Sequence, residues 1–182
     1  MFTGIQYYPV FDLGVSQIYL NEEKLTNIRS WFNSSNLSSF DPLPVHDFGN
    51  GRLTLTDGHS RAFLAYSMGV YKIPIVYDSD DMVTSATGQM LYKNDIIWCE
   101  RFKIYSISDL KDRIISNFLY NDLWIGRCGK AYNLLMQTTE LQRKKWQSMY
   151  PDLYLYGASE DLSLLFFEDE QGALFTIPIS KS

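Results

Sequence analysis

The alternation of apolar and polar positions predicts strands and helices in turn along the first half of the chain. Short apolar runs indicate strands at residues 17–20, 43–48, 52–56 and 72–77. Apolar residues that recur every three or four positions indicate helices at residues 22–32 and 60–68. The glycine-containing turn at residues 49–51 joins two of these strands as a hairpin. We therefore expect one domain over residues 1–81, closed by the acidic loop at residues 78–81.

The second half of the chain has a different pattern. Spaced apolar residues predict helices that pack on one another at residues 91–102, 107–118 and 123–136. Apolar runs separated by acidic turns predict a small antiparallel meander at residues 153–156, 162–167 and 173–177. We expect an α+β protein whose residues 82–182 form a mainly helical C-terminal lobe that ends in these terminal β-strands.

Composition and charge narrow the classes of function. The chain has 182 residues, of which 46% are hydrophobic, and this content is typical of a folded globular protein. A net charge of −5 offers no broad attraction for a nucleic-acid backbone, so non-specific DNA binding is disfavoured. No helix-turn-helix module is recognisable in the C-terminal part of the chain, so we do not expect specific DNA binding either. No apolar run approaches the roughly 20 residues that cross a bilayer, and no signal peptide is recognisable, so we expect a cytoplasmic protein without a membrane segment. Cys99 and Cys128 lack the spacing of a zinc site or a redox pair.

One turn between two predicted strands carries most of the polar chemistry. It reads Asp57-Gly58-His59-Ser60-Arg61 and opens the predicted helix. Backbone N–H groups and the positive end of a helix dipole favour an anion at such a place. Gly58 lets a ligand approach the backbone, and Arg61 adds a planar fork of donors that suits phosphate or carboxylate. His59 can move a proton, and Asp57 can hold His59 or Arg61 or accept a hydroxyl proton.

A purely structural interpretation of this turn is also open. Asp57 or Ser60 would then cap the helix, Gly58 would serve the turn, and Arg61 would pair with a surface carboxylate. Because a cap requires neither His59 nor an arginine, the sequence favours a binding site.

The same region resembles a known superfamily. Residues 53–65, followed by Gly69 and the strand at residues 73–76, are similar to the signature of ParB/sulfiredoxin-like domains. Members of that superfamily bind nucleotide phosphates at a Gly-x-x-Arg turn: ATP in sulfiredoxin, CTP in ParB proteins and ADP in archaeal-type free serine kinases. The Asp-Gly-His-Ser-Arg form is closest to the serine kinase branch. The Gly-Glu-Arg-Arg of ParB and the cysteine of sulfiredoxin are absent. The resemblance covers about residues 10–81 and does not extend to the rest of the chain.

The resemblance implies a role for each residue of the turn. It implies a nucleotide cofactor (ATP, ADP or CTP), with Mg²⁺, held at Gly58, His59, Ser60 and Arg61. Asp57 and His59 would orient a phosphoryl transfer. Glu22 occupies the position expected for the base that acts on a small hydroxyl substrate, with Glu23 as the reserve. An alternative for both glutamates is favourable charge at a helix N-terminus.

Several functions stay open on the sequence alone, and it does not decide whether the protein is an enzyme. The first is a nucleotide-binding, small-molecule phosphotransferase. The second is a non-catalytic nucleotide sensor or interaction module, with a protein partner bound by the C-terminal lobe. A ParB-like nuclease ranks lower, because it needs a metal-carboxylate site and a basic groove.

The sequence gives little support for a metal site. A divalent metal site could be formed by His46 and His59 together with Asp47 or Asp57. The chain has only these two histidines, which is little support for such a site. Asp57 and the loop at residues 78–81 offer carboxylates for a phosphate-bound Mg²⁺. We therefore assign no residue as a metal ligand.

Overall fold

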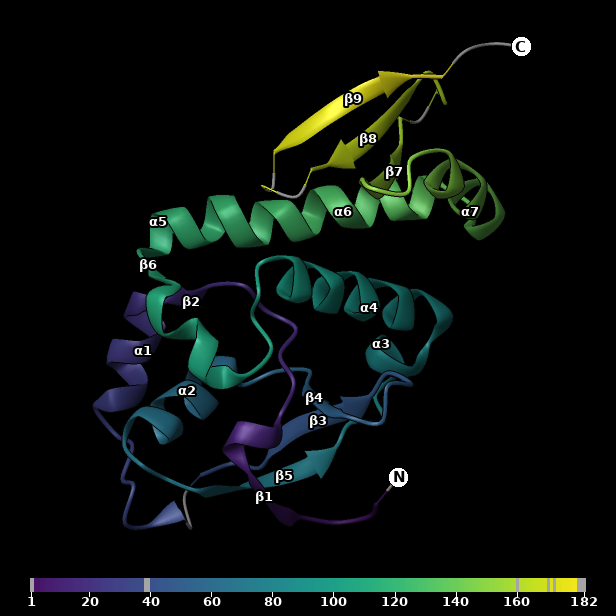
Figure 1. Cartoon of the computed structure of the whole chain (residues 1–182). Helices are drawn as coiled ribbons and strands as arrows, with labels where there is room; N and C mark the ends of the chain where they lie inside the picture. The colour runs from purple at the N-terminus through teal and green to yellow at the C-terminus, as the bar shows by residue number, and fades with distance from the viewer. Residues whose placement is uncertain (1, 38–39, 160, 170, 172, 180–182) are drawn as a thin grey trace. The chain divides into compact units, whose positions relative to one another are not determined.

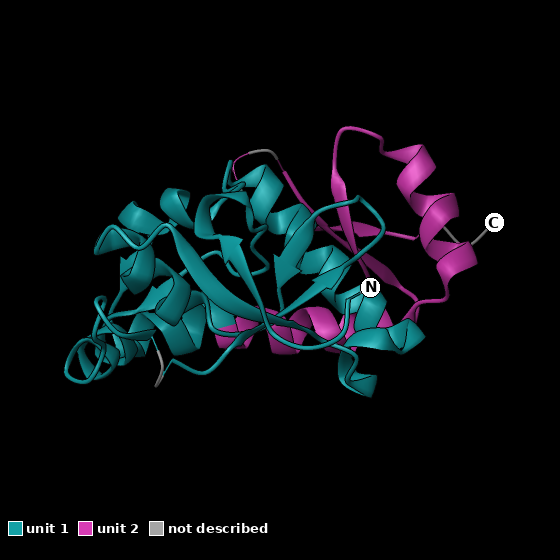
Figure 2. Ribbon diagram, turned by 90° about the horizontal axis from the view of Figure 1, so that it is seen from below, with its two compact units in different colours: residues 1–124 teal, residues 125–182 magenta. Residues whose placement is uncertain are grey.

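The computed structural model describes residues 2–37, 40–159, 161–169, 171 and 173–179. The chain divides into two compact units, residues 1–124 and residues 125–182 (Figure 2). Each unit combines helices with a β-sheet, so the expected α+β class is confirmed.

A four-stranded mixed sheet forms the centre of the first unit (Figure 1). Its strands, in spatial order, are β1 (Gln6–Pro9), β5 (Lys72–Tyr77), β3 (Leu43–Asp47) and β4 (Leu53–Leu55). β1 pairs with β5 and β3 pairs with β4 in antiparallel fashion, whereas β3 and β5 are parallel. The predicted hairpin at residues 43–56 and the predicted strand at 72–77 are confirmed.

Two helices pack on each other beside this sheet. These are α1 (Glu22–Arg29) and α2 (His59–Ser67). α2 leads from β4 to β5, and it buries Ala62, Phe63, Leu64 and Ala65. Four consecutive buried residues mean that α2 is covered on more than one side, so its N-terminus is held firmly relative to the sheet.

The rest of the first unit is made of short elements around one longer helix. They are η1 (Val10–Asp12), β2 (Leu20–Asn21), α3 (Asp81–Thr84), α4 (Ala86–Arg101), η3 (Ile107–Asp112), β6 (Ile114–Ile115), α5 (Asn117–Tyr120) and the π-helical turn η4 (Asn121–Ile125). The strand predicted at residues 17–20 is reduced to β2. The helix predicted at 107–118 is wrong, because Ile114 and Ile115 pair with β2 and Ser116 caps a new helix.

Residues beyond 81 belong to the same compact unit as the residues before it. β2 and β6 are parallel neighbours, with Leu20 opposite Ile114. The side-chain amide of Asn21 donates to Oδ1 of Asn117 over 2.7 Å. The compact units therefore divide at residues 124 and 125, and the boundary expected after residue 81 falls inside the first of them.

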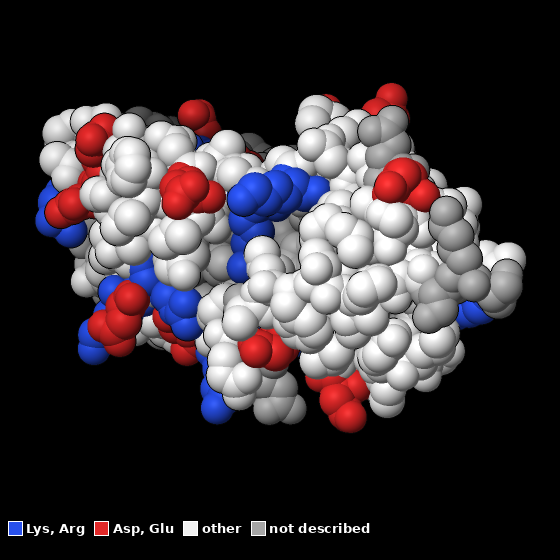
Figure 3. Space-filling view, turned by 90° about the horizontal axis from the view of Figure 1, so that it is seen from above, with Lys and Arg blue, Asp and Glu red and all other residues white. Residues whose placement is uncertain are grey.

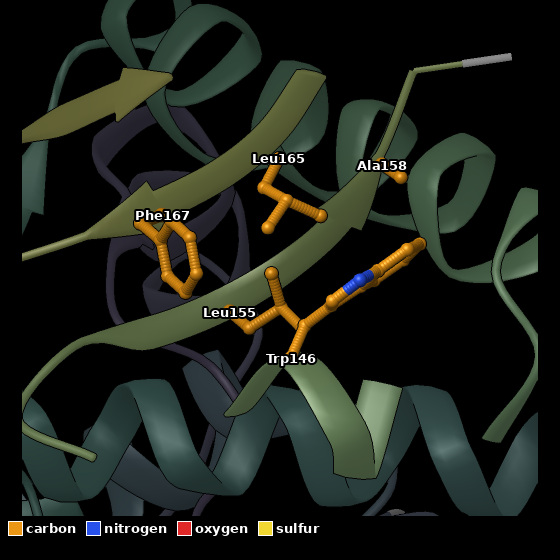
Figure 4. Packing of buried hydrophobic residues seen from close by; sticks show 5 residues of the cluster. All are labelled: Trp146, Leu155, Ala158, Leu165 and Phe167. Carbon is orange, nitrogen blue, oxygen red and sulfur yellow. The ribbon is translucent and has the colours of Figure 1, made fainter. Parts of the chain in front are cut away.

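The second unit consists of two helices and a three-stranded antiparallel meander. Its elements are α6 (Gly126–Gln137), α7 (Glu140–Met149), β7 (Tyr154–Ala158), β8 (Leu164–Glu168) and β9 (Leu174–Pro178). Its apolar core is formed by Trp146, Leu155, Ala158, Leu165 and Phe167 (Figure 4). The predicted terminal meander is confirmed.

One buried ion pair ties α6 to the meander. Nη2 of Arg127 lies 2.5 Å from Oε2 of Glu168, whose side chain is almost fully buried. The same guanidinium lies 5.5 Å from the ring centroid of Tyr156. A buried charge pair of this kind costs desolvation, so it depends on both partners being present.

Of the helices in the described part of the chain, none has both the length and the apolar character needed to span a bilayer.

Candidate functional site

Gly58 sets the geometry at the start of α2. Its backbone has φ 79° and ψ 17°, the left-handed region that glycine adopts without steric cost. A Cβ atom built at this position would lie 2.6 Å from Cδ2 of Leu43 on β3. Both the backbone conformation and the close approach of β3 therefore require glycine here.

The N-terminus of α2 has no side-chain cap. Gly58 is the N-cap residue, and no side chain hydrogen-bonds to the first N–H groups of the helix. α1 differs, because Oδ1 of Asn21 accepts the N–H of Lys24 over 3.1 Å. The alternative that Asp57 or Ser60 caps α2 is thus wrong, and the first backbone donors of α2 are left for water or a ligand.

Arg61 places its guanidinium against the same turn. A Cβ at Gly58 would lie 3.2 Å from Nη2 of Arg61, so the guanidinium lies directly beside the glycine. Nη1 donates to the carbonyl oxygen of Asp41 over 3.2 Å, and the ring of Phe40 lies 5.9 Å from Cζ. The side chain keeps 20% of its surface exposed. One cation and the first backbone N–H groups of α2 therefore lie at the same turn, where Ser60 and Arg61 are partly exposed and Gly58 and His59 are buried.

Asp57 lies at the rim of this turn. Its side chain is 82% exposed, and its Oδ2 is 3.8 Å from Nη2 of Arg61. A contact of that length between an exposed carboxylate and an arginine contributes little to stability. Asp57 can therefore move away from Arg61 when a stronger anion arrives.

The ring of His59 is buried, in contrast to the expected role in orienting a ligand or moving a proton. The residue is 3% exposed, and the backbone N–H of Ser16 donates to its Nε2 over 3.1 Å. Accepting at Nε2 places the proton of the neutral ring on Nδ1, which has no hydrogen-bond partner among the described residues. Burial lowers the pKa of His59 to about 4, against a smaller opposing effect of Asp57. At the N-terminus of α2, His59 therefore contributes its backbone N–H and not its ring.

Ser60 occupies the second position of α2 and is half-buried. Like His59, it contributes a backbone N–H at the N-terminus of α2. The turn thus brings together Gly58, the backbone of His59 and Ser60, and the side chain of Arg61.

Glu22 and Glu23 lie apart from the turn in sequence but on an element that packs against α2. Both are exposed residues of the first turn of α1, immediately after the N-cap residue Asn21. β2 and α1 both contact α2. Among the described residues, no hydrogen bond or ion pair joins either glutamate to the turn, so the structure leaves both carboxylates at the surface.

A polar network on the far side of the turn was not identified from the sequence. Thr56 donates from Oγ1 to Oδ2 of Asp78 over 2.5 Å, and the hydroxyl of Tyr92 donates to the carbonyl oxygen of Thr56 over 3.2 Å. Nδ1 of His46 donates to the carbonyl oxygen of Asp78 over 2.8 Å. The side-chain amide of Gln89 donates to Nε2 of the same histidine, His46, over 3.1 Å. In the sequence, the local indication of this network was the spacing of Gln89 and Tyr92, because residues three positions apart are neighbours on the surface of a helix.

This network bears on the metal alternatives. Both ring nitrogens of His46 are engaged, and the ring of His59 is bonded to Ser16, so the two histidines do not form a metal site together. More broadly, the described residues contain no group of three or more His, Cys, Asp or Glu arranged to hold a metal ion.

The surroundings of the turn are acidic. Burial, together with smaller effects of the nearby carboxylates of Asp78, Asp95, Asp57 and Asp80, raises the pKa of Tyr92 to about 12. Figure 3 shows a face on which basic and acidic groups are interspersed, some of them side by side, and the described residues form no broad basic patch in that view.

Comparison of the chain with protein-family models and with curated proteins finds no match.

Proposed function

We propose that the first unit binds the phosphate group of a nucleotide at the N-terminus of α2. The observation that carries this proposal is the uncapped helix start at Gly58, with the guanidinium of Arg61 beside it. Backbone N–H groups and a fixed arginine fork are the two donors that most often recognise phosphate oxygens in proteins. The resemblance of the turn to ParB/sulfiredoxin-like domains supports the same assignment.

In this proposal each part of the turn has a separate task. The backbone N–H groups of His59 and Ser60 and the side chain of Arg61 hold phosphate oxygens. The ring of His59 instead fixes the strand-like segment at Ser16, which keeps the turn in place. Asp57 is exposed and weakly paired, so it exchanges its contact with Arg61 for an orienting contact with the ligand.

The acidic surroundings favour a nucleotide that arrives with Mg²⁺. Asp57, Asp78 and Asp80 lie near one another around Tyr92 and repel a bare polyphosphate. A magnesium ion on the phosphates cancels part of that repulsion and needs only one or two protein carboxylates. The same acidity counts against the nuclease alternative, which would have to hold a nucleic-acid backbone here.

We further propose that the bound nucleotide donates a phosphoryl group to a small hydroxyl compound, with Glu22 as the base. An exposed carboxylate at the start of α1, on an element that packs against α2, supports this role. A non-catalytic sensor is the second candidate. It is favoured by the lack of any bond between Glu22 and the turn among the described residues.

A thermal-shift titration of the full chain tests the binding site. Wild type, Arg61→Ala and the control Arg29→Ala are compared with ATP, ADP, CTP and GTP, each with Mg²⁺. Arg29 is an exposed residue at the end of α1, so the control removes the same charge away from the turn. We expect one nucleotide to raise the Tm of wild type and of Arg29→Ala but not of Arg61→Ala. An equal shift in all three proteins would overturn the site.

Turnover distinguishes the two candidates. The nucleotide identified by the shift is incubated with a panel of small hydroxyl compounds that includes free serine, and product is measured for wild type and Glu22→Gln. Transfer that is lost in Glu22→Gln, with nucleotide affinity unchanged, supports the phosphotransferase. Binding without transfer to any compound supports the sensor.

A further inference from the structure

A hollow in the first unit lies outside the turn at residues 57–61. It is formed by the edge strand β4, the segment at residues 14–15 and the C-terminal half of α4, with Arg52, Thr54, Ile96, Cys99 and Glu100 among its lining residues. Its cavity volume is about 40 Å³. Sites that bury drug-sized ligands span roughly 300–1,000 Å³, so this hollow suits only a molecule of a few non-hydrogen atoms and not a nucleotide.

Gly14 makes room for a polar group on the wall of this hollow. Gly14 extends the sheet beyond β4, because its N–H donates to the carbonyl oxygen of Leu53 over 2.8 Å and its own carbonyl oxygen accepts the N–H of Leu55 over 3.0 Å. A Cβ at Gly14 would lie 2.5 Å from Oγ1 of Thr54. Only glycine therefore lets the Thr54 hydroxyl lie over the backbone at this position.

Two side chains on this wall have hydrogen-bond donors that can reach a ligand. Nε and Nη2 of Arg52 donate to the carbonyl oxygens of Asp12 and Leu13, each over 3.0 Å, which fixes the guanidinium and leaves Nη1. Within the described part of the chain, neither Nη1 of Arg52 nor the hydroxyl of Thr54 has a hydrogen-bond partner. A guanidinium nitrogen and a hydroxyl on one wall match the two oxygens of a carboxylate.

The other walls define the rest of the ligand. Val15, Ile96 and Ile104 contribute apolar surface, which suits a short aliphatic chain. Glu100 also lines the hollow and would repel a second negative charge on the ligand. Asp109 also lies near enough to Arg52 for the two charges to interact, and the N–H groups of Tyr105 and Ser106 favour its ionised form, so part of the Arg52 charge is already offset and the hollow suits a ligand with a single negative charge.

We infer that this hollow binds a small aliphatic monocarboxylate, with its carboxylate on Arg52 and Thr54 and its chain against the apolar wall. The site does not depend on the proposed nucleotide function. It is nevertheless connected to the turn through the backbone, because Val15 lines the hollow and Ser16, the next residue, donates to His59. A ligand that presses on Val15 changes the environment of the His59 ring.

The two histidines of the chain provide a direct readout. His46 and His59 are the only histidines, and each gives a separate ring signal in a ¹H–¹³C NMR spectrum, assigned with His46→Asn. Sodium propionate is titrated into the full-length protein at constant ionic strength, with succinate and sodium chloride as comparison probes. We expect propionate to shift the His59 signal saturably and to leave the His46 signal in place.

Matched variants test the contacts. Thr54→Val keeps the shape of the side chain and removes the hydroxyl, so propionate affinity should fall about tenfold. Glu100→Gln should strengthen succinate binding more than propionate binding, because succinate carries the second negative charge. Arg61→Ala should abolish a nucleotide response and keep the propionate response, so failure of one site is distinguishable from failure of the other. A propionate response equal in wild type and Thr54→Val, or no saturable response, would overturn the inference.

Discussion

The backbone N–H of Ser16 donates to Nε2 of His59 over 3.1 Å, across 43 positions of the sequence. This bond fixes the segment beside β4 to the first residue of α2, and it requires His59 to be neutral. The sequence suggested that His59 moves a proton. In the structure it is instead a buried residue whose hydrogen bond joins two parts of the first unit.

Burial of the neutral His59 ring makes the free energy of unfolding depend on pH. In the unfolded chain His59 takes up a proton near its ordinary pKa of 6.5, whereas burial lowers its pKa to about 4 in the folded protein. Between these two values the unfolded state binds more protons, so acidification favours unfolding there. The stabilisation is fully present above pH 6.5, and about 3 kcal/mol of it should be lost by pH 4.

Urea unfolding at a series of pH values measures this effect. His59→Gln keeps an acceptor for Ser16 and cannot titrate, so its free energy of unfolding should change less than that of wild type between pH 6.5 and 4. His46→Asn serves as the control, since it removes the other histidine. Parallel pH curves for wild type and His59→Gln would show that His59 is not buried in its neutral form.

Gly58 should be far more sensitive to substitution than a glycine with a similar backbone. Gly58→Ala adds a Cβ that meets Leu43 at 2.6 Å, in addition to the strain of φ 79°. Gly69 has φ 77° and no neighbouring atom within 4 Å, so Gly69→Ala carries the strain alone. We expect about 1 kcal/mol of destabilisation for Gly69→Ala and about 3 kcal/mol for Gly58→Ala.

A double-mutant cycle separates the two contributions at Gly58. Leu43→Ala removes the atom that a Cβ at Gly58 would meet, so Gly58→Ala should cost less in that background than in wild type. The free energies of unfolding come from urea titration of the four proteins. Equal costs in both backgrounds would show that the approach of β3 does not constrain the turn.

The buried ion pair between Arg127 and Glu168 should contribute more to stability than the exposed ion pair between Lys144 and Glu140. Arg127→Ala removes the guanidinium that pairs with the buried Glu168 carboxylate, and breaking a buried ion pair in this way typically costs about 3–5 kcal/mol. Lys144 and Glu140 form an exposed pair on α7, and Lys144→Ala should leave the free energy of unfolding nearly unchanged. Near-UV circular dichroism during urea unfolding reports the loss of packing around Trp146. A similar small cost for both variants would mean that water reaches Glu168.

Several elements followed from the sequence because their signals are local. The strand at residues 72–77 was predicted from its apolar run, in which the structure buries Ile73 and Ile75, and the start of α2 from a glycine that precedes a run of apolar residues. The direction of the His59 ring was not predictable, because it depends on Ser16 in a distant segment. The network of Thr56, Asp78 and Tyr92 was missed for the same reason, since each bond joins different elements.

The division of the chain at residue 124 can be tested with fragments. Leu20 is fully buried and pairs with Ile114, and Asn21 is bonded to Asn117, so residues 107–124 complete the surroundings of α1. A fragment of residues 1–124 should unfold cooperatively in urea, with helical circular dichroism. A fragment of residues 1–81 leaves Leu20 and the Asn21 amide uncovered, and it should show a shallow transition or none.

Asn117→Leu in the full chain connects this test to a single contact. It removes the acceptor for the buried Asn21 amide, and an unpaired buried amide costs about 1–3 kcal/mol. Asn121→Leu is the control, because Asn121 reaches the same oxygen at 3.5 Å from an exposed position. If the fragment of residues 1–81 folds as stably as that of residues 1–124, and Asn117→Leu costs no more than Asn121→Leu, the first unit ends at the acidic loop and residues 82–124 only cover it.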